Sequence, residues 1–323
     1  MFFNFMPNAG NCLILGGGGF IGSHVADMLL KRGYRVTIFG KRNSKKTNLA
    51  HILDRVKIIE GDFNNDVDVR QSLDRIDYVF HLISGTLPAT SNDNPIYDIE
   101  INLVNTIRLL NASVERGVKK IIFVSSGGTV YGTPTHIPIS EQHPTHPISS
   151  YGVVKKAIED YLFMYHALYG LDYTVLRLSN PYGERQNIFG VQGAVAVFLR
   201  KALNGEPIEI WGDGNTVRDY VYIGDVAEAF VNALETTTAE KIFNIGSGDG
   251  RSLNDIINLI STIHGPRIEV KYLPARRVDI PVNILDISLA RTHLNWQPTT
   301  PFQDGVKRFY NYLNTQRYAQ HVG

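Results

Sequence analysis

The stretch that decides the fold is Leu15-Gly16-Gly17-Gly18-Gly19-Phe20-Ile21-Gly22, which lies between a short apolar run and a longer amphipathic one. Three of its glycines have the spacing of a phosphate-binding turn between a strand and a helix. Gly16 permits the tight turn, Gly19 lets the backbone approach a pyrophosphate, and Gly22 lets helix and strand pack closely. The helix N-terminus adds amide donors and a partial positive charge. This context predicts a dinucleotide-binding site, with a plain glycine-rich connection as the alternative.

The segments around this stretch alternate between short apolar runs and amphipathic ones, which is typical of βα units around a parallel sheet. Helices are predicted at Phe20–Arg32 and Tyr97–Arg116, each closed by a glycine that accepts the left-handed conformation. Another helix is predicted to begin near Tyr151. Strands are predicted at Cys12–Leu15, Arg35–Phe39, Val56–Glu60, Asp77–Leu82, Lys119–Ser125 and Tyr173–Leu178. The predicted fold class is therefore α/β, with a Rossmann-type doubly wound parallel sheet.

After Leu178 the pattern is more mixed and predicts a smaller C-terminal α/β lobe. The segments expected there are strands Ile208–Trp211, Tyr220–Ile223, Ile242–Ile245 and Glu269–Leu273 and helices Asp225–Glu235 and Leu253–His264. We expect a cofactor domain at residues 1–178 and a second lobe at residues 179–323, with some chain returning to the first domain. A chain of 323 residues has room for both.

The composition narrows the class of protein. Thirty-two Lys and Arg against 31 Asp and Glu leave a net charge of +1, and 43% of the residues are hydrophobic, which disfavours a nucleic-acid-coating or disordered protein. An anionic ligand must therefore be held by a few local cations and backbone dipoles. The single cysteine, Cys12, excludes an internal disulfide framework, and no apolar run reaches the roughly 18 residues of a membrane span. We expect a cytoplasmic, enzyme-sized protein without a membrane or nucleic-acid partner.

The segment Thr133–Ser150 is rich in Pro, His, Thr and Ser and is predicted to be a loop. It contains His136, His143 and His146. No carboxylate or cysteine joins these histidines at ligand spacing, so we assign no metal and expect all three to be solvated.

The residues after the second and third predicted strands bear on which dinucleotide binds. An acid that hydrogen-bonds the adenosine ribose is expected about 20 residues past the glycine turn, but the second strand ends in Phe39-Gly40-Lys41-Arg42. Lys41 and Arg42 can hold a 2′-phosphate, which keeps NADP as an alternative to NAD, or they are solvated loop charges. Asp62-Phe63 is the predicted adenine-edge contact, with an ordinary turn as the alternative.

Tyr151 and Lys155 are four residues apart at the start of a predicted helix, so their side chains share one face. A phenol with a pKa near 10 is a poor base at neutral pH, and lowering this pKa to about 7 takes roughly 4 kcal/mol of phenolate stabilisation. Lys155 and a nicotinamide cation can supply it together. Such a pair alone is common on helices, but beside the glycine turn it predicts acid–base chemistry.

Together these motifs resemble the extended short-chain dehydrogenases/reductases of the NAD-dependent epimerase/dehydratase family. The resemblance runs from about Cys12 to Trp296. It is carried by Gly16-x-x-Gly19-x-x-Gly22, Asp62, His81, Asn102, Ser125-Ser126, Val130-Tyr131-Gly132, Tyr151-x-x-x-Lys155, Arg177, Asn180-Pro181-Tyr182-Gly183, Gly212-Asp213-Gly214, Arg218-Asp219-Tyr220-Val221, Asn244-Ile245-Gly246-Ser247-Gly248 and Arg276-Arg277-Val278-Asp279.

The resemblance implies a nucleotide sugar bound between the lobes and a homodimer paired through Tyr97–Arg116 and Tyr151–Tyr169. Tyr151 would take the proton of the sugar 4-hydroxyl while hydride passes from C4 to the nicotinamide, which yields a 4-keto sugar. The implied substrate-binding residues are Asn180, Arg218, Arg276 and Asp279, with surface salt bridges to Asp219 or Asp279 as the alternative for each arginine. The predicted cofactor-binding residues are Gly16, Gly19, Phe20, Ile21, Gly22, Lys41, Arg42, Asp62, Phe63, Leu82, Tyr151 and Lys155.

One position departs from the family pattern. Where relatives carry a catalytic Ser or Thr, four residues before Tyr131, this sequence has Gly127. We expect Thr129 or Ser126 to supply the missing hydroxyl, because either can donate and accept a hydrogen bond. Otherwise Tyr151 handles the proton alone, or activity is weakened.

The same segment narrows the reaction. Dehydrating and decarboxylating relatives carry carboxylates where this sequence has Gly127-Gly128-Thr129, which favours a nucleotide-sugar 4-epimerase. Asn283 stands where a bulky residue narrows the sugar pocket of related epimerases, so UDP-hexose, UDP-N-acetylhexosamine and UDP-hexuronate all remain candidates. The alternatives are an NADP-dependent reductase of a nucleotide-bound keto sugar and a non-catalytic nucleotide-sugar-binding regulator.

Overall fold

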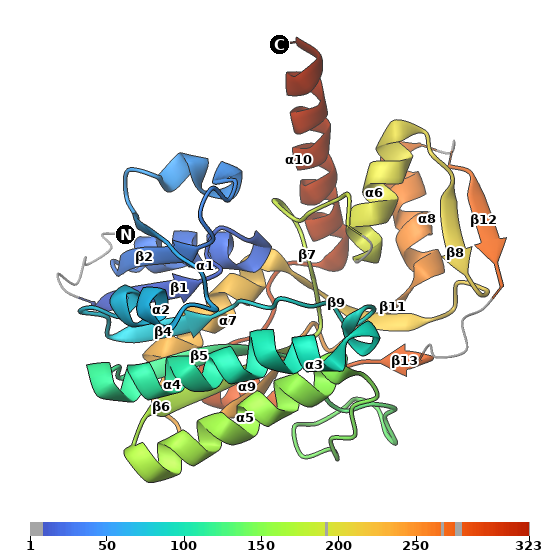
Figure 1. Cartoon of the computed structure of the whole chain (residues 1–323). Helices are drawn as coiled ribbons and strands as arrows, with labels where there is room; N and C mark the ends of the chain where they lie inside the picture. Colours follow the sequence, from blue (N-terminus) through green and yellow to red (C-terminus); the bar gives the residue numbers. More distant parts are fainter. Residues whose placement is uncertain (1–8, 191–192, 266–267, 275–279, 323) are drawn as a thin grey trace.

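The computed structural model describes residues 9–190, 193–265, 268–274 and 280–322 (Figure 1). Its centre is a seven-stranded sheet in the order β10-β6-β5-β4-β1-β2-β3, and every neighbouring pair is parallel. The strands are β1 (Asn11–Leu15), β2 (Arg35–Gly40), β3 (Lys57–Glu60), β4 (Tyr78–His81), β5 (Lys120–Ser126), β6 (Asp172–Leu178) and β10 (Ile242–Ile245). The predicted doubly wound α/β fold is confirmed.

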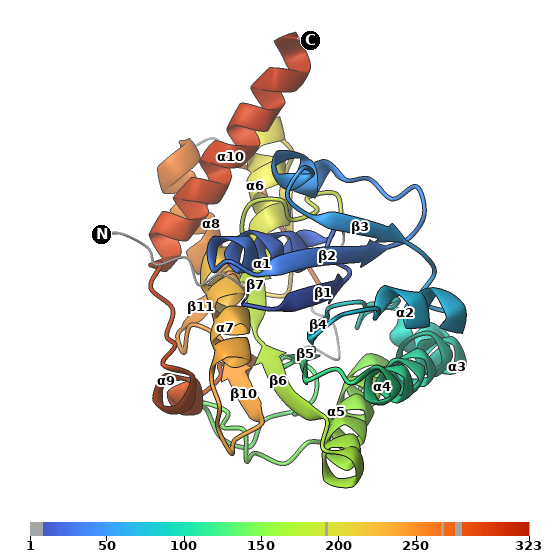
Figure 2. The same ribbon diagram turned by 90° about the vertical axis from the view of Figure 1, so that its left-hand side faces the viewer.

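Helices cover both faces of this sheet, as Figure 2 shows. Successive residues of a strand point to opposite faces, and the four residues of β1 from Cys12 to Leu15 are fully buried on both faces. Cys12 and Ile14 pack in one core with α1 (Phe20–Lys31) and α7 (Ile223–Glu235). Leu13 and Leu15 pack in another with α2 (Asp66–Ser72), α4 (Asn105–Arg116) and α5 (Ser150–Tyr169). Burial on both faces explains why these strands are continuous apolar runs.

The helix predicted at Tyr97–Arg116 is not regular, which corrects the sequence reading. It begins at α3 (Pro95–Asp98), continues through the π-helical segment η3 (Ile99–Val104) and ends in α4, where Gly117 has a φ of 70°. Within η3 the Asn102 side chain accepts a hydrogen bond from the Gly85 amide at 2.8 Å and donates to Asp98. These contacts with a distant loop accompany the wider turn, and apolar periodicity does not reveal them.

The smaller lobe holds two short sheets and their own core. In one, β9 (Val217–Tyr222) pairs with β7 (Asn180–Tyr182), β11 (Gly250–Ser252) and β13 (Val282–Asn283); in the other, β8 (Ile208–Trp211) pairs with β12 (Val270–Leu273). The helices packed with them are α6 (Ala194–Asn204), α8 (Leu253–His264) and α10 (Phe302–Val322). Although α7 and β10 follow Leu178 in sequence, they lie in the layers of the main sheet, and α9 (Ser288–Leu294) packs there too.

The loop after β5 holds the three histidines, and one of them does not behave as expected. His136 and His146 are exposed, but His143 is buried. Its Nε2 accepts a hydrogen bond from the Thr135 amide at 3.0 Å, and its ring stands edge-on to the Tyr131 ring. The prediction of a solvated His143 is therefore wrong, because the loop folds back and packs this ring against Tyr131.

The described residues contain no group of three or more His, Cys, Asp or Glu side chains arranged to hold a metal ion. None of the helices in the same ranges combines the length and hydropathy needed to cross a bilayer. Cys12 is fully buried in the core, and burial raises the pKa of its thiol, as suits a small packing residue.

The strand order indicates where a ligand-binding crevice is expected. Chain progression reverses between β1 and β4, and open parallel sheets bind ligands outside the carboxyl ends of the strands at such a switch point. The glycine stretch leaves β1 here, and residues 82–86 leave β4 beside it.

Candidate active site

The geometry of the glycine turn shows which glycines it needs. Gly16 has a φ of 84°, in the left-handed region, and its amide donates to the Phe39 carbonyl at 3.0 Å. A Cβ on Gly22 would lie 2.5 Å from the Gly16 carbonyl oxygen and 2.6 Å from the Gly17 Cα. Both are backbone atoms, so α1 packs directly on the turn and position 22 accepts only glycine.

The N-terminus of α1 is open to an anionic ligand. Its N-cap, Gly19, offers no side-chain cap, and the first turn contains no acidic residue. The first amides of the helix, including those of Phe20 and Ile21, can therefore donate to a ligand and add the positive end of the helix dipole. This donor set, next to a backbone stripped of side chains, fits the pyrophosphate of a dinucleotide.

The predicted adenosine-side residues are mostly exposed. Lys41 and Arg42 lie in the turn after β2 with exposed side chains. Asp62 is exposed too, and its carboxylate accepts hydrogen bonds from the Asn64 amide at 3.0 Å and the Asn64 side chain at 2.9 Å. The structure thus places Asp62 in a local turn at the carboxyl end of β3.

Phe63 and Leu82 lie closer to the sheet. Phe63 is buried, and its ring centre lies 5.3 Å from that of His81 at the end of β4. The Leu82 amide donates to the Leu15 carbonyl at 3.1 Å, which ties the loop after β4 to the strand before the glycine turn.

Tyr151 and Lys155 share one face of α5, one turn apart, as predicted. The side chain of Ser149 caps this helix and fixes its start. Lys155 is buried, and its Nζ donates to the Val124 carbonyl at 3.0 Å. The same Nζ lies 4.7 Å from the centre of the Phe123 ring and 5.4 Å from that of Tyr151. A phenol and an ammonium thus stand together beside the crevice.

Burial shifts both groups toward their neutral forms. It raises the pKa of Tyr151 to about 12, and the Asp98 carboxylate acts in the same direction, while a hydrogen bond with Ser84 opposes them. It lowers the pKa of Lys155 to about 8, against the opposing effect of Asp98 and Glu159. Without a further cation nearby, the phenol is a weak base.

The packing around Gly127 leaves no free volume for a side chain. A Cβ at this position would lie 2.6 Å from Cδ1 and 3.0 Å from Cδ2 of Leu285. Leu285 is fully buried in a small core with Val130, Tyr131 and Ile139. The leucine fills the volume that a serine or threonine would need at position 127.

Two polar atoms near Gly127 are buried without a hydrogen-bond partner among the described residues. They are Oγ1 of Thr129 and Oδ1 of Asn283. The Nδ2 of Asn283 donates to the Gly127 carbonyl at 3.3 Å. Ser126, the last residue of β5, is half-buried. Because unpaired buried oxygens cost free energy, these atoms point to a polar ligand group.

Glu159, which no sequence motif singled out, lies on α5 one turn after Lys155. Its carboxylate accepts from the Arg177 Nη2 at 2.6 Å and from the Ser125 hydroxyl at 2.5 Å, and all three side chains are buried. Arg177 also donates to the Tyr131 hydroxyl at 2.9 Å. The four-residue spacing from Lys155 was the signal that this acid lies on the same buried face.

The smaller lobe contributes a cavity of about 710 Å³, which includes Asn180, Tyr182, Phe198, Lys201, Trp211 and Arg218 in its wall. Arg218 donates to the carbonyls of Val217 at 2.8 Å and Ile280 at 2.7 Å, and Asn180 donates to the Asp219 carbonyl at 2.9 Å. The structure thus brings two of the four predicted substrate residues together. Arg276 and Asp279 lie outside the described residues.

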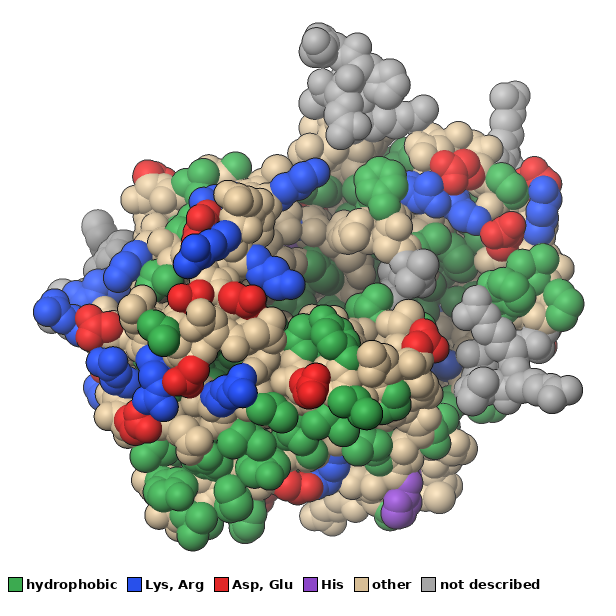
Figure 3. Space-filling view, in the orientation of Figure 1, with side chains coloured by type: hydrophobic (Ala, Val, Ile, Leu, Met, Phe, Trp, Pro, Cys, Tyr) green, Lys and Arg blue, Asp and Glu red, His purple; other side chains and the backbone are tan. Residues whose placement is uncertain are grey.

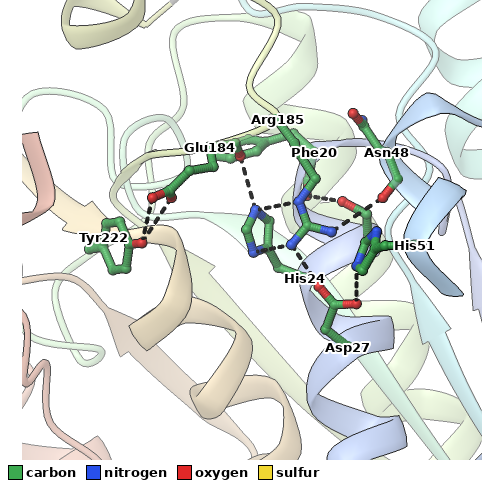
Figure 4. Close-up of polar contacts among 9 residues, drawn as sticks. Phe20, His24, Asp27, Asn48, His51, Glu184, Arg185 and Tyr222 are labelled. Carbon is green, nitrogen blue, oxygen red and sulfur yellow. Dashed lines mark hydrogen bonds and ion pairs between the residues drawn. The ribbon is translucent and has the colours of Figure 1, made fainter. Parts of the chain in front are cut away.

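Arg185, another residue that the sequence analysis missed, joins the smaller lobe to the cofactor side (Figure 4). From the loop after β7 its guanidinium pairs with the Asp27 carboxylate at 2.7 Å and contacts His24 Nδ1 at 2.7 Å. It also donates to the carbonyl of Asn48, in the 3-10 helix η1 (Thr47–Ile52), at 3.2 Å. The Asn48 side chain in turn donates to the Gly18 carbonyl at 3.2 Å. Arg185 has a φ of 67°, which is uncommon outside glycine.

Comparisons with known proteins agree with this fold. Residues 12–246 match the NAD dependent epimerase/dehydratase family. The chain belongs to this family. It is 37% identical over 302 residues to a putative UDP-glucose 4-epimerase of Methanocaldococcus jannaschii, covering 93% of this chain and 97% of that one.

Two solved structures are similar over almost the whole chain. The UDP-glucose 4-epimerase of Thermotoga maritima with UDP-glucose has a TM-score of 0.90 and 39% identity, covering 95% of this chain and 99% of that one. The UDP-glucose 4-epimerase of Thermus thermophilus in complex with NAD has a TM-score of 0.86 and 33% identity, covering 94% and 99%. The chain is thus an NAD-dependent enzyme of the epimerase type.

Proposed function

We propose that this enzyme interconverts UDP-sugars that differ in configuration at C4, through a transient 4-keto sugar. The observation that carries the proposal is that Lys155 contacts the last part of β5 and Tyr151 contacts Ser84 after β4, at the same end of the sheet as the glycine turn after β1. The cavity that contains Arg218 supports it, because a guanidinium suits a diphosphate.

In this mechanism Tyr151 accepts the proton of the sugar 4-hydroxyl. It returns the proton after the 4-keto sugar has rotated in the site and presents its other face. When bound, NAD would supply a reversible hydride acceptor, which takes the hydride from sugar C4 and gives it back to the opposite face, and a positive charge beside the phenol. The ammonium of Lys155 stabilises the phenolate from its own helix. Lowering the pKa of Tyr151 from about 12 to near 7 requires roughly 7 kcal/mol, which is more than one partly screened cation provides, so both charges are needed.

The turn Gly127-Gly128-Thr129 supports epimerisation rather than elimination. It places no acid or base beside the sugar, whereas loss of water from a keto sugar needs both. For the missing family hydroxyl we propose Thr129, whose Oγ1 is buried and unpartnered, ahead of Ser126. A Thr129→Val variant should lose turnover at least tenfold, and Ser126→Ala should lose less; full turnover in Thr129→Val would contradict this assignment.

For the sugar we propose a UDP-hexose as the main substrate. The relatives named above are UDP-glucose 4-epimerases. Asn283 lies against the Gly127 carbonyl and is of moderate size, so UDP-N-acetylhexosamine is expected to bind as well.

The test starts by denaturing the purified protein and identifying the released dinucleotide. Fresh protein is then incubated with UDP-glucose, UDP-N-acetylglucosamine and UDP-glucuronate without added cofactor, and products are followed by NMR. We expect NAD and C4 epimers. Tyr151→Phe should remove activity and keep bound NAD. Reduction of keto sugars with NADPH, without epimerisation, would indicate a reductase, and binding without turnover would indicate a regulator.

We further propose that the enzyme is a homodimer paired through α3 to α5. Apolar side chains gather over these helices in Figure 3. Those exposed on α5 include Val153, Phe163 and Leu168, and those on α3 include Ile96 and Tyr97. Sedimentation should show a dimer that Phe163→Glu/Leu168→Glu converts to a monomer; a monomeric wild type would reject the proposal.

A further inference from the structure

Asp98, the last residue of α3, is a fully buried carboxylate next to the catalytic pair. Its oxygens accept hydrogen bonds from the Thr86 hydroxyl at 2.5 Å, the Asn102 side chain at 2.8 Å and the Ser150 hydroxyl at 2.6 Å. These donors come from three segments: the loop after β4, the π-helical η3 and the first turn of α5. Three donors around one carboxylate satisfy oxygens that burial removes from water.

The contacts of Asp98 complete a closed series of contacts that includes the catalytic tyrosine. Ser150 immediately precedes Tyr151, and Tyr151 hydrogen-bonds to Ser84. The Ser84 hydroxyl donates to the Thr86 carbonyl at 3.1 Å, and Thr86 donates to Asp98. Through these contacts, the loop that leaves β4 at the cofactor crevice is tied to the start of the catalytic helix.

Backbone groups at the start of α5 are held by the same loop. The Ser150 amide donates to the Asn92 side chain at 2.8 Å, and the Tyr151 amide donates to the Ser91 hydroxyl at 3.1 Å. Asp98 is the one charged member of this set of contacts.

Few charged groups act on the pair in this part of the fold. Asp98 acts on both Tyr151 and Lys155, and Glu159 acts on Lys155 from the next turn of α5. His81, at the end of β4, also faces Lys155, but burial lowers its pKa to about 3, so it is neutral. Glu159 is already paired with Arg177 at 2.6 Å, whereas the donors described for Asp98 are neutral, which leaves its charge to act on the catalytic pair.

We propose that Asp98 is a positioning residue for Tyr151 and Lys155: it fixes the first turn of α5 against the loop after β4 and supplies the negative charge that keeps buried Lys155 protonated. This inference rests on the proposed function, in which the pair transfers the proton of the sugar hydroxyl. No sequence motif marks Asp98, because its partners come together only in the folded chain.

Asp98→Asn tests the charge separately from the shape. The amide has the size of the carboxylate, and the hydroxyls of Ser150 and Thr86 can accept as well as donate, so the contacts can persist. A nearby anion raises the pKa of a phenol and of an ammonium alike. Removing the Asp98 charge should therefore lower the pKa of both Tyr151 and Lys155. Both limbs of the pH profile of kcat/KM should move to lower pH, by about one unit each. A purely structural lesion would lower the profile without displacing it.

Ser150→Ala is the matched control, because it removes one hydrogen bond and keeps the charge. It should reduce turnover several-fold and leave both pH midpoints in place. If Asp98→Asn does not fold, Asp98→Ser is the second neutral variant and must displace both midpoints in the same direction. Midpoints equal to those of wild type in the neutral variant would overturn the proposal.

A second readout does not depend on activity. In protein labelled with [ζ-¹³C]tyrosine, the Tyr151 resonance is assigned as the one missing from Tyr151→Phe. It should titrate at lower pH in Asp98→Asn than in wild type, and an unchanged titration would again reject the role of Asp98. If wild type epimerises no UDP-sugar, the proposed function fails, while this titration still decides the inference.

Discussion

The glycine turn after β1 and the Gly127 turn after β5 both follow the carboxyl ends of strands in the main sheet, but they exclude side chains in different ways. At Gly22 the obstacle is backbone, namely the Gly16 carbonyl and the Gly17 Cα. At Gly127 the obstacle is the end of a side chain, Leu285, from a distant part of the chain. A glycine enforced by nearby backbone is irreplaceable, whereas one enforced by a side chain can be replaced when that side chain changes too.

The largest effect is expected for Gly22→Ala. The new methyl group would meet backbone at 2.5 Å, so α1 must move away from the glycine turn, where we expect the cofactor phosphates to bind. We expect loss of bound NAD and destabilisation of about 3 kcal/mol or more, measured by dinucleotide release and urea unfolding. Gly18→Ala is the control, since its Cβ would meet nothing nearer than Leu49 at 3.9 Å; equal damage in both variants would show the explanation to be wrong.

The second prediction concerns Gly127→Ser, which restores the family side chain. Alone it should destabilise the protein by about 1–3 kcal/mol, because Cδ1 of Leu285 occupies the site. Combined with Leu285→Ala, the total loss should be smaller than the sum of the two single losses by about 1 kcal/mol. Urea unfolding of wild type, the two single variants and the double variant measures this coupling. Additive losses would count against the packing argument.

The third prediction uses the contact between the lobes beside the glycine turn. Burial and the Arg185 cation lower the pKa of His24 from 6.5 to about 4. In the unfolded chain the His24 imidazole therefore takes up a proton below pH 6.5, whereas in the folded protein it takes one up only near pH 4. Stability should fall over this window by on the order of 2–3 kcal/mol. His24→Gln should flatten the loss in urea unfolding measured at several pH values, and a parallel loss in both proteins would refute it.

The smallest effect is expected at the exposed turn after β2. Lys41→Ala/Arg42→Ala should change NAD affinity by less than about 1 kcal/mol, because screened surface charges contribute little. Calorimetric titration with NAD and NADP checks this, and NADP binding should weaken more. A large loss of NAD affinity would mean that these cations contact the cofactor directly.

Features that depend on neighbours in sequence were predictable. The strands of the first half lie within one residue of their predicted ends, because each is an apolar run between turns. The glycine turn and the Tyr151–Lys155 pair were also recognisable, since their geometry follows from spacing along one element. The confirmed family and fold rest on these local patterns.

Features that depend on contacts between segments were not predictable. The sequence placed Asp98 inside an ordinary helix, and His143 on a solvated loop, because neither residue's partners adjoin it in sequence. Glu159 and Arg185 likewise form their ion pairs with residues of other elements. Glu159 pairs with Arg177, and Arg185 pairs with Asp27.

The sequence alone determined the parallel α/β sheet, the glycine turn and the catalytic spacing, because these are set by backbone conformation and by periodicity within single elements. Tertiary structure decided that a side chain at position 127 would meet Leu285, that Lys155 is buried against the rings of Phe123 and Tyr151, and that Arg185 ties the two lobes together. Packing volume, burial and the pairing of charges arise only when distant segments meet, so no local pattern records them.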